Sequence, residues 1–473
     1  MEKTQAQIEF ENFSAVPRRS FHNEKAIEYC INWAKDHGLE YFFDEKNKNL
    51  LIMKPATPGM EDKPGIALQG HLDMVAVCDE GIVHDWENEG IDLLIDGDFY
   101  TANGTTLGGD DGMAVAIAFA LLSDETARHP ALEVLLTTDE EVGMCSVREA
   151  DLTFMKSKYM INIDSGGEGE FTVGCAGGSH IDVIVPNIRE KISGNTISIS
   201  VTGLQGGHSG VEITNERANA LKILGDVLYS LSREVGFRIC GLEAEGKDNA
   251  IQKEAGVVIV TDETPVRISE LIERCKKKIR RKFRLADPDI DIRISSTRCE
   301  DALCEKESES LMALLHLLPF GVHHFDQNLK FIETSMNVGP VTKDERGIAI
   351  TCMIRSSVGE RSEEVQDMLR HICSLTGAEY VDKNETYPAW LPDFDTYLLK
   401  QMSAVYEEMY GVKPRAVSTH GGLECGYILA NSNIEEVVAL GPDCYDEHST
   451  NERLSIPSLN RTYDFVKAVV ERL

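Results

Sequence analysis

Short apolar runs alternate with polar segments in the first third of the chain. Residues 66–68, 134–136 and 160–163 are apolar, and each run is followed by polar or charged residues. Between the first two runs, residues 113–122 are almost entirely apolar, which predicts a buried helix. This rhythm is typical of an α/β domain with a largely covered sheet. Ligands of such sheets bind beyond the carboxyl ends of the strands, so the polar segments are candidate site residues.

The pattern changes after Val185. Residues 186–195 have the composition of a linker, and residues 197–201 then alternate as a half-exposed strand does. A helix over 218–231, a strand over 255–262 and a helix over 270–283 with a strongly basic side are predicted next. A similar round follows, with a helix over 310–318, a strand over 347–357 and a helix over 363–375.

These two rounds suggest an internal duplication. Residues 248–262 can be laid over residues 336–355, which places Asn249 opposite Asn337. From Trp390 the chain returns to the pattern of predicted helices and strands seen in its first third. We therefore predict an α/β domain in two segments, 1–186 and 389–473, interrupted by an inserted α+β domain over 187–388. Its two similar halves would be about 187–295 and 296–388.

Composition limits the partners and the compartment. The 473 residues include 47 Lys and Arg against 79 Asp and Glu, a net charge of −32. That charge argues against nucleic acid or an anionic membrane as a partner. No apolar run approaches the length of a membrane span, and the N-terminal residues are acidic rather than signal-like. We expect a soluble cytoplasmic protein whose 12 Cys residues form no disulfide framework and are mostly buried thiols.

Five segments carry residues suited to chemistry, and each has an ordinary interpretation when taken alone. An acid before a helix is usually a cap, adjacent acids are usually solvated, and a single His is usually structural. Four of the five, however, follow apolar runs or open a helix in one predicted α/β domain, so they should converge at one sheet edge. The residues are His71 and Asp73 in GHLDM, Asp110 in TTLGGDDG, Glu140 and Glu141 in TTDEEVG, Asp164 in NIDSGGEGE and His448 in GPDCYDEHST.

Such a cluster needs compensation for its negative charge. Several neighbouring carboxylates repel one another, and divalent cations are the simplest counter-charge. Two His residues with carboxylates suit zinc, cobalt or manganese rather than calcium, which prefers sites built only from oxygen. We therefore predict a transition-metal or zinc site.

The motifs also resemble those of a known family. GHLDM, TTLGGDDG, TTDEEVG, NIDSGGEGEFTVGCAGG, GLQGGHSG, HGGLECG and GPDCYDEHS are similar, in order and spacing, to those of the aminoacyl-histidine or cytosol nonspecific dipeptidases. That family belongs to the co-catalytic dizinc peptidases and deacylases, and the resemblance extends over essentially the whole chain. It implies a mixed-sheet catalytic domain with helices on both faces and an inserted lid domain.

The resemblance implies a complete metal site. Asp110 would bridge two divalent ions, most simply Zn²⁺, with Co²⁺ or Mn²⁺ as alternatives. His71 and Asp164 would complete one metal, and Glu141 and His448 the other. Glu140 would be the general base for attack by a metal-bridging hydroxide on the scissile carbonyl, and Asp73 would orient His71.

The resemblance also implies groups that bind a small peptide substrate. His208 would support the oxyanion, and Arg355 would receive a substrate carboxylate through its guanidinium fork. Asn337 and Asn249 are both candidates for a further polar contact. Gly422 and Glu424 of HGGLECG would lie at the pocket floor, and Glu424 could hold a substrate amine. Whether the protein is a monomer or a homodimer stays open.

Two departures and two rival functions remain. The family commonly has GADNG where this chain has GGDDG, so Asp111 is an additional acid that either shifts metal preference or is solvated; Cys78 near the site is also unusual. A tripeptidase or N-acyl amino acid deacylase would use the same metals and base. A metal- or peptide-binding protein without activity is disfavoured because every expected ligand and the base are present. Walker, GxGxxG, GxSxG and HExxH motifs are absent.

Overall fold

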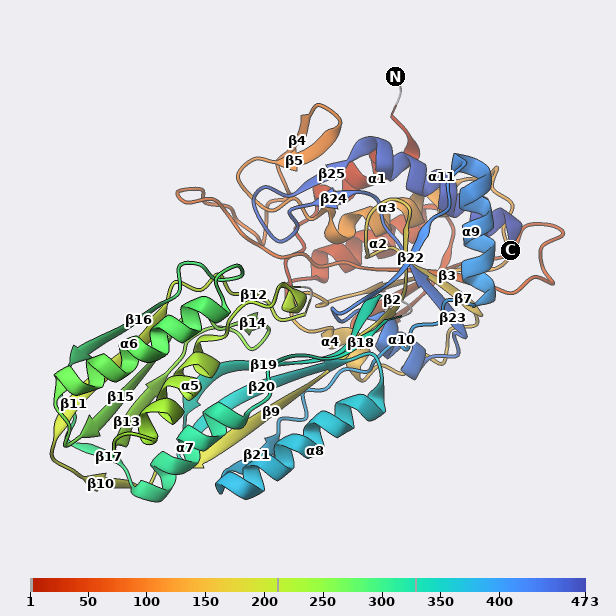
Figure 1. Ribbon diagram of the computed structural model, residues 1–473. Coiled ribbons are helices and arrows are strands. Elements are labelled where there is room, and N and C mark those ends of the chain that lie inside the picture. The colour runs from red at the N-terminus through yellow and green to blue at the C-terminus, as the bar shows by residue number, and fades with distance from the viewer. Residues whose placement is uncertain (1–2, 211, 328–329) are drawn as a thin grey trace. The chain divides into compact units, whose positions relative to one another are not determined.

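The computed structural model describes residues 3–210, 212–327 and 330–473 (Figure 1). The chain divides into two compact units. Unit 1 comprises residues 1–175, 390–418 and 423–473, and unit 2 comprises residues 176–389 and 419–422. Each unit has its own hydrophobic core.

Unit 1 is built around a mixed eight-stranded sheet, as the sequence predicts. Parallel pairing joins β6 to β3, β3 to β7 and β7 to β23, whereas antiparallel pairs occur on either side of this parallel centre. The order is β1 (Glu40–Asp44), β2 (Asn49–Lys54), β6 (Leu132–Thr137), β3 (Ile66–His71), β7 (Tyr159–Asn162), β23 (Glu436–Ala439), β8 (Glu170–Cys175) and β22 (Arg415–Thr419). A smaller sheet contains β24 (Cys444–Tyr445), β25 (Arg453–Ser455), β5 (Phe99–Ala102) and β4 (Leu93–Asp96).

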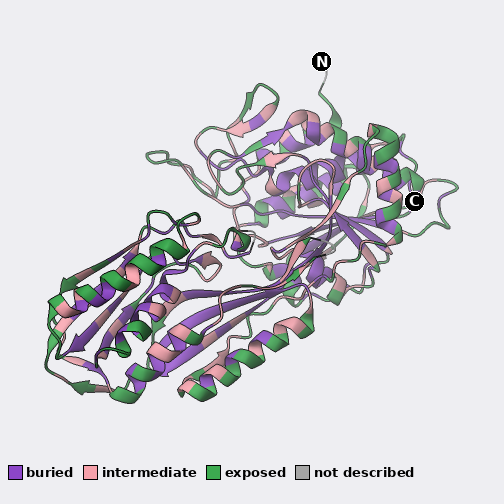
Figure 2. Ribbon diagram, in the orientation of Figure 1, coloured by how far each residue is buried: buried purple, intermediate pink, exposed green. Residues whose placement is uncertain are grey.

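The predicted apolar helix is the centre of the unit 1 core. Helix α3 (Gly109–Ser123) packs on β3 and contacts α1 (Gln5–Ser14) and α11 (Ile456–Arg472). Its residues 113–122 are all buried, which confirms the prediction from their composition (Figure 2). The remaining helices of unit 1 are α2 (Glu24–Asp36), α4 (Cys145–Arg148), α9 (Tyr397–Tyr410) and α10 (Cys425–Asn431).

In its described residues, unit 2 contains two larger antiparallel sheets and four helices. Helices α5 (Ala220–Ser232) and α6 (Pro265–Lys282) pack on a four-stranded sheet of β13 (Arg238–Glu243), β15 (Ala255–Thr261), β11 (Asn195–Thr202) and β16 (Asp291–Ser296). Helices α7 (Glu305–Leu317) and α8 (Gly359–Thr376) pack on a five-stranded sheet of β18 (Gly321–Asp326), β19 (Phe331–Lys343), β20 (Gly347–Ser356), β9 (Gly177–Pro186) and β21 (Glu379–Asp382). Short elements are β10 (Arg189–Lys191), β17 (Asp301–Leu303), β12 (Gly207–His208), β14 (Ala250–Ile251) and η1 (Ile213–Asn215).

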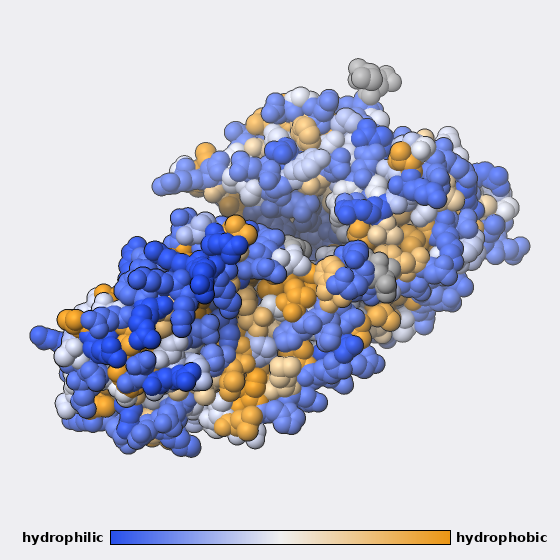
Figure 3. Space-filling model, in the orientation of Figure 1, coloured by the Kyte–Doolittle hydropathy of each residue, from blue (hydrophilic) through white to orange (hydrophobic). Residues whose placement is uncertain are grey.

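The periodicity of unit 2 matches its burial. Strand β11 alternates between buried and partly exposed positions, as expected from residues 197–201. Helix α6 buries four aliphatic residues, Ile268, Leu271, Ile272 and Ile279, and leaves a basic outer side. That side is the strongly hydrophilic patch over α6 in Figure 3.

Two sequence expectations are wrong in detail. Residues 186–195 are not only a linker, because β10 lies within them and pairs with β17, more than 100 residues away. Cys240 and Cys299 are not free thiols, because they are joined as a disulfide between β13 and the segment before β17. Of the other ten Cys residues, five are buried, four are half-buried and one is exposed, so the prediction of mostly buried thiols holds for half of them. Within the described part of the chain, the helices lack the combination of length and apolar character that a membrane span requires.

Candidate active site

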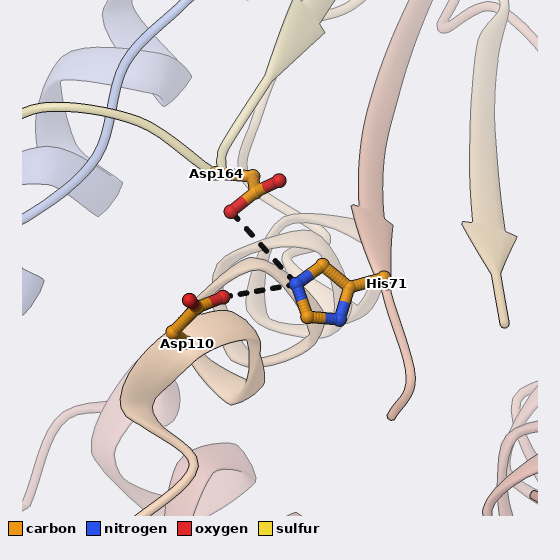
Figure 4. A group of neighbouring side chains, drawn as sticks. All are labelled: His71, Asp110 and Asp164. Carbon is orange, nitrogen blue, oxygen red and sulfur yellow. Dashed lines mark hydrogen bonds and ion pairs between the residues drawn. The ribbon is translucent and has the colours of Figure 1, made fainter. Parts of the chain in front are cut away.

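The first group of candidate ligands forms where parallel strands of unit 1 end. His71 is the last residue of β3, and Asp164 follows the neighbouring strand β7 by two positions. Asp110 comes from the first turn of α3, which packs on β3. His71 Nε2 lies 2.9 Å from Asp110 Oδ1 and 3.8 Å from Asp164 Oδ1 (Figure 4). The sequence argument for convergence at one sheet edge thus agrees with the positions of these side chains.

A second group shares Asp110 with the first. His448 Nε2 lies 3.1 Å from Asp110 Oδ2 and 3.0 Å from Glu141 Oε2. Within each group, the ligand atoms lie within 4.8 Å of one another. The groups differ in exposure, because the His71 side chain is 1% exposed and the His448 side chain is 52% exposed. One carboxylate, with one oxygen toward each histidine, therefore joins two three-residue groups.

Asp73 supports both sides of this arrangement. Its carboxylate lies 3.4 Å from His71 Nδ1 and accepts the hydroxyl hydrogen of Ser20 at 2.7 Å. It also accepts the backbone N–H groups of Glu140 at 3.1 Å and Glu141 at 3.3 Å. One buried side chain thus fixes the His71 ring and the segment that carries the adjacent glutamates, which is how outer partners orient metal ligands.

The electrostatics reflect crowded carboxylates. Burial raises the pKa of Glu140 to about 8; the charge of His71 opposes this shift and Glu424 reinforces it. Burial and the charge of Asp110 hold the pKa of Asp164 well above its usual range. Burial alone would lower the pKa of His71, but hydrogen bonds to Asp110 and Asp73 raise it well above its usual value. The raised pKa values of Glu140 and Asp164 thus reflect the cost of placing several buried carboxylates together.

These residues fit divalent metal ions. Glu141 Oε1 is buried and has no hydrogen-bond partner among the described residues. Imidazole nitrogens and carboxylate oxygens are ligands for zinc and its neighbours in the first transition series. The first group could hold one ion, the second group another, and Asp110 could contribute an oxygen to each.

Glu424 lies in a buried polar network of unit 1. Its Oε2 accepts hydrogen bonds from Gln69 Nε2 and Thr137 Oγ1, both at 2.6 Å, and Gln69 Oε1 accepts one from Asn162 at 2.6 Å. Its Oε1 is buried with no described partner. Burial, opposed by the charge of His71, raises the pKa of Glu424 to about 7. The free oxygen can accept a donor from a ligand.

Unit 2 brings its own predicted residues into one buried polar region. Arg355, on β20, is 4% exposed and donates to Tyr387 Oη at 2.8 Å and to the His420 carbonyl at 3.4 Å. Among the described residues it forms no ion pair, and its Nε has no partner. His208 is on β12; burial, followed by the charge of Arg355, lowers its pKa.

The two candidate asparagines lie side by side in unit 2. Asn337 is buried on β19, and its amide donates to the carbonyls of Asp248 and Ala250 at 2.9 and 2.8 Å. Its Oδ1 has no described partner. Asn249 lies between those two carbonyls in the chain, and its own carbonyl accepts the N–H of Ser209. Asn337 thus fixes the Asn249 segment, while Gly422 is half-buried in the short unit 2 segment 419–422.

The two departures have different outcomes. Asp111 is not solvated: it is fully buried and accepts the backbone N–H groups of His71 at 3.0 Å and Ala114 at 3.3 Å. It therefore fixes the backbone at the end of β3. The peptide bond between Asp110 and Asp111 is cis. Cys78 is half-buried and its backbone bridges to Thr105, two residues before Leu107 in the segment that leads to α3.

Sequence reasoning missed two buried charged residues at the site, Arg18 and Glu452. Both bind backbone groups of the turn that precedes Asp110. Glu452 lies only four residues after His448, and this proximity is the one sequence signal that could have drawn attention to it. Arg18, in VPRRS, has no comparable signal.

This chain is similar in sequence and structure to known peptidases. Residues 67–472 match Peptidase family M20/M25/M40. The chain is 32% identical over 470 residues to the cytosol non-specific dipeptidase of Escherichia coli K12, covering 98% of this chain and 96% of that protein. Its structure is similar to that of the aminoacylhistidine dipeptidase of Vibrio alginolyticus, with a TM-score of 0.89, 32% identity, and 99% and 96% of the two chains covered.

A more distant structure shares the fold alone. Aminopeptidase PepT from Bacillus cereus is 16% identical, with a TM-score of 0.57 over 99% of this chain and 97% of that one. The family match extends over most of the chain, and the E. coli relative is similar along nearly its whole length. The resemblance inferred from the motifs is thereby confirmed, and this chain belongs to peptidase family M20/M25/M40.

Proposed function

We propose that this chain is a dipeptidase that hydrolyses Xaa-His and other dipeptides with the help of two divalent metal ions. The observation that carries the proposal is the pair of three-residue groups joined by Asp110. The two relatives at 32% identity are named as dipeptidases, and one of them as an aminoacylhistidine dipeptidase. The E. coli relative is named as a cytosolic enzyme, and we propose the same compartment for this chain.

His71, Asp110 and Asp164 would hold one ion, and Asp110, Glu141 and His448 the other. We favour Zn²⁺ for this mixture of nitrogen and oxygen ligands, with Co²⁺ or Mn²⁺ as the alternatives. Two such ions polarise a carbonyl and make water nucleophilic at neutral pH. The buried, unpartnered Glu141 Oε1 supports a cation at this place.

Glu140 is our candidate for the general base. Its backbone N–H is held by Asp73, and the neighbouring residue Glu141 belongs to the second ligand group. A carboxylate fixed beside the ligands is suited to accept a proton from the attacking water and to pass it to the amine that leaves. Asp73, which contacts the His71 ring and both glutamate N–H groups, would fix the position of the base Glu140 relative to the ligand His71.

Six residues are proposed to bind the substrate, and unit 2 supplies five of them. Arg355 is a buried cation without a counter-ion among the described residues, so a substrate carboxylate would compensate its charge. His208 would support the oxyanion. The free Oε1 of Glu424 in unit 1 would accept hydrogen bonds from a substrate amine. Asn337, Asn249 and Gly422 complete the proposed set. We assign catalysis to unit 1 and substrate binding chiefly to unit 2.

A substrate panel with metal analysis tests the proposal. Purified protein should contain two metal ions per chain and should hydrolyse Xaa-His dipeptides with a higher kcat/KM than tripeptides or N-acetylated amino acids. Faster turnover of acetylated amino acids or tripeptides would replace the dipeptidase assignment by one of these related activities. Absence of hydrolysis across the panel with the metals bound would favour a binding protein.

Substitution of the base tests the mechanism. Glu140→Gln should lower kcat by about 100- to 10,000-fold, the usual contribution of a general base, while two metals remain bound. The measurements are steady-state kinetics and metal content. Glu149→Gln, an exposed acid at the end of α4, serves as the control and should retain wild-type turnover. Turnover by Glu140→Gln within a few-fold of wild type would refute the role of Glu140.

A further inference from the structure

Glu452 makes an unusual set of contacts beside the site. It is 3% exposed, and its two carboxylate oxygens accept four consecutive backbone N–H groups. Oε2 accepts from Leu107 at 2.8 Å and Gly108 at 3.0 Å. Oε1 accepts from Gly109 at 2.8 Å and Asp110 at 3.3 Å. The whole turn that delivers the shared ligand Asp110 is therefore bound by one side chain.

Arg18, a cation, binds a carbonyl group of the same turn, whereas Glu452 binds its N–H groups. It is 1% exposed; its Nη1 donates to the carbonyls of Leu72 and Asp73, both at 3.2 Å, and its Nη2 donates to the carbonyl of Gly108. Leu72 and Asp73 directly follow the ligand His71. Arg18 thus joins the His71 segment to the Asp110 turn, whereas Glu452 joins that turn to the segment carrying His448.

The glycines of TTLGGDDG allow the side chains of Arg18 and Glu452 to come close to the backbone of the turn. Gly108 has φ of +67°, and a Cβ there would collide with the Arg18 guanidinium and with Met74 Sδ at 2.8 Å. A Cβ on Gly109 would lie 3.3 Å from Glu452 Oε1 and 3.0 Å from the sulfur of Cys444. The turn is therefore shaped to admit two buried charged side chains, which explains both glycines without any contact to substrate.

We propose that Glu452, with Arg18 as its counterpart, is a positioning residue that preorganises the Asp110 turn for metal binding. The inference rests on the proposed function, because it assumes that Asp110 contacts both metals. Four hydrogen bonds to consecutive amides leave the turn little freedom, so Asp110 does not have to be ordered when the metal binds. Outer partners of metal ligands typically contribute about 10- to 100-fold in affinity or activity.

Glu452→Gln is the direct test, because it preserves the size of the side chain. The new NH₂ group cannot accept, so two of the four backbone N–H groups lose their partner. We expect the affinity of the apo protein for Zn²⁺ or Co²⁺, measured by calorimetry or chelator competition, to fall about 10- to 100-fold at the weaker site. We expect added metal to restore much of kcat. Because a bound metal also stabilises a weakened fold by mass action, a control variant of similar stability is needed.

Glu133 offers a matched control in the same unit. It is 5% exposed on β6 and accepts the backbone N–H groups of Lys156 at 3.0 Å and Ser157 at 2.8 Å, outside the ligand groups. Glu133→Gln should reduce thermal stability to a similar degree but leave metal affinity unchanged. Equal losses of affinity in both variants, or an affinity of Glu452→Gln within twofold of wild type, would overturn the inference.

Two further outcomes are distinguishable. If the wild-type protein binds no metal, the proposed function fails and this inference fails with it. If the wild type binds two metals and Glu452→Gln also does so normally, only the inference fails. Should Glu452→Gln not fold, hydrogen exchange of the apo wild type decides. Slow exchange at residues 107–110 supports a preorganised turn, and exchange as fast as in exposed loops overturns it.

Discussion

The candidate site residues of the two units differ in charge. At the edge of the unit 1 sheet, Asp110, Asp164 and Glu141 lie within reach of two histidines, and Glu141 Oε1 has no described partner. In unit 2, the candidate site residue with a buried charge is Arg355, whose guanidinium contacts a hydroxyl and a carbonyl but no carboxylate among the described residues. One unit is therefore suited to cations and the other to an anionic group.

This contrast shows why net charge is a poor guide to function. The value of −32 describes mostly exposed acids, and it predicts a solubilising surface and nothing about unit 2. An exposed charge interacts weakly through water, whereas an uncompensated buried charge is costly and thus indicates a missing partner. A few buried groups then define the chemistry of each unit, and each can be altered separately.

The largest expected effect comes from removing the anion shared by both groups of unit 1. Asp110→Asn should lose metal from both groups and lower kcat/KM by about a thousandfold or more. Lewis-acid stabilisation amounts to several kcal/mol, and each 1.36 kcal/mol is a factor of ten in rate. Metal content by mass spectrometry and kcat/KM on a dipeptide are the measurements.

Asp164→Asn provides the graded comparison, because Asp164 belongs only to the first group. It should weaken one metal and retain the other. If Asp110→Asn keeps two metals and near-normal turnover, the two groups are not joined through Asp110. The proposed metal ligands of unit 1 would then be wrong.

The next largest effect tests whether Arg355 of unit 2 binds the substrate carboxylate. Arg355→Met should raise KM for a dipeptide about 100-fold, because loss of one partner of a buried charge pair costs about 2–5 kcal/mol. The decisive substrate is the same dipeptide with its carboxylate amidated. Wild type should lose a comparable amount of kcat/KM on this amide, and Arg355→Met should show little further loss.

Arg355→Lys keeps the charge but not the planar fork, so an intermediate KM is expected. Arg189→Met removes another arginine of unit 2, one that already has Asp301 as its partner, and should leave KM unchanged. If Arg355→Met slows the amidated and the free dipeptide equally, Arg355 does not bind the substrate carboxylate.

The fold was predictable where a pattern is local. The apolar stretch 113–122 could only be a buried helix, and the alternation in 197–201 identified β11. The expected start of α6 at residue 270 was five residues late, because Thr264 caps the helix through the Arg267 N–H and Pro265 occupies the first turn. Strand β10 was missed because its partner β17 is more than 100 residues distant.

The site was predictable for the same reason, and only in part. Proposed ligands such as His71 and Asp164 follow apolar strands, so parallel pairing brings them to one edge. Arg18 and Glu452 follow no such rule, because their partners are backbone carbonyls and amides. A sequence does not reveal which backbone groups a distant side chain will satisfy, and these contacts depend on the completed fold.

The smallest predicted effect is a pH dependence confined to unit 2. Burial, the charge of Arg355 and the nearby His208 lower the pKa of His420 to about 3, with the Ile332 carbonyl acting in the opposite direction. Its pKa in the unfolded chain is about 6.5. The stability due to neutral His420 is therefore complete above pH 6.5 and is lost as pH falls toward 3. At pH 5 the loss is about 2 kcal/mol.

Unfolding of unit 2, followed by hydrogen exchange in β19 and β20 between pH 7 and 5, measures this loss. His420→Gln retains a polar partner for Ser335 Oγ but cannot be protonated, so the decrease should become shallower by about 2 kcal/mol. His371→Gln, at an exposed position of α8, should leave it unchanged. An unaltered pH dependence in His420→Gln would mean that the pKa of His420 is the same in the folded and the unfolded chain, and it would refute the lowered pKa and the resulting loss of stability.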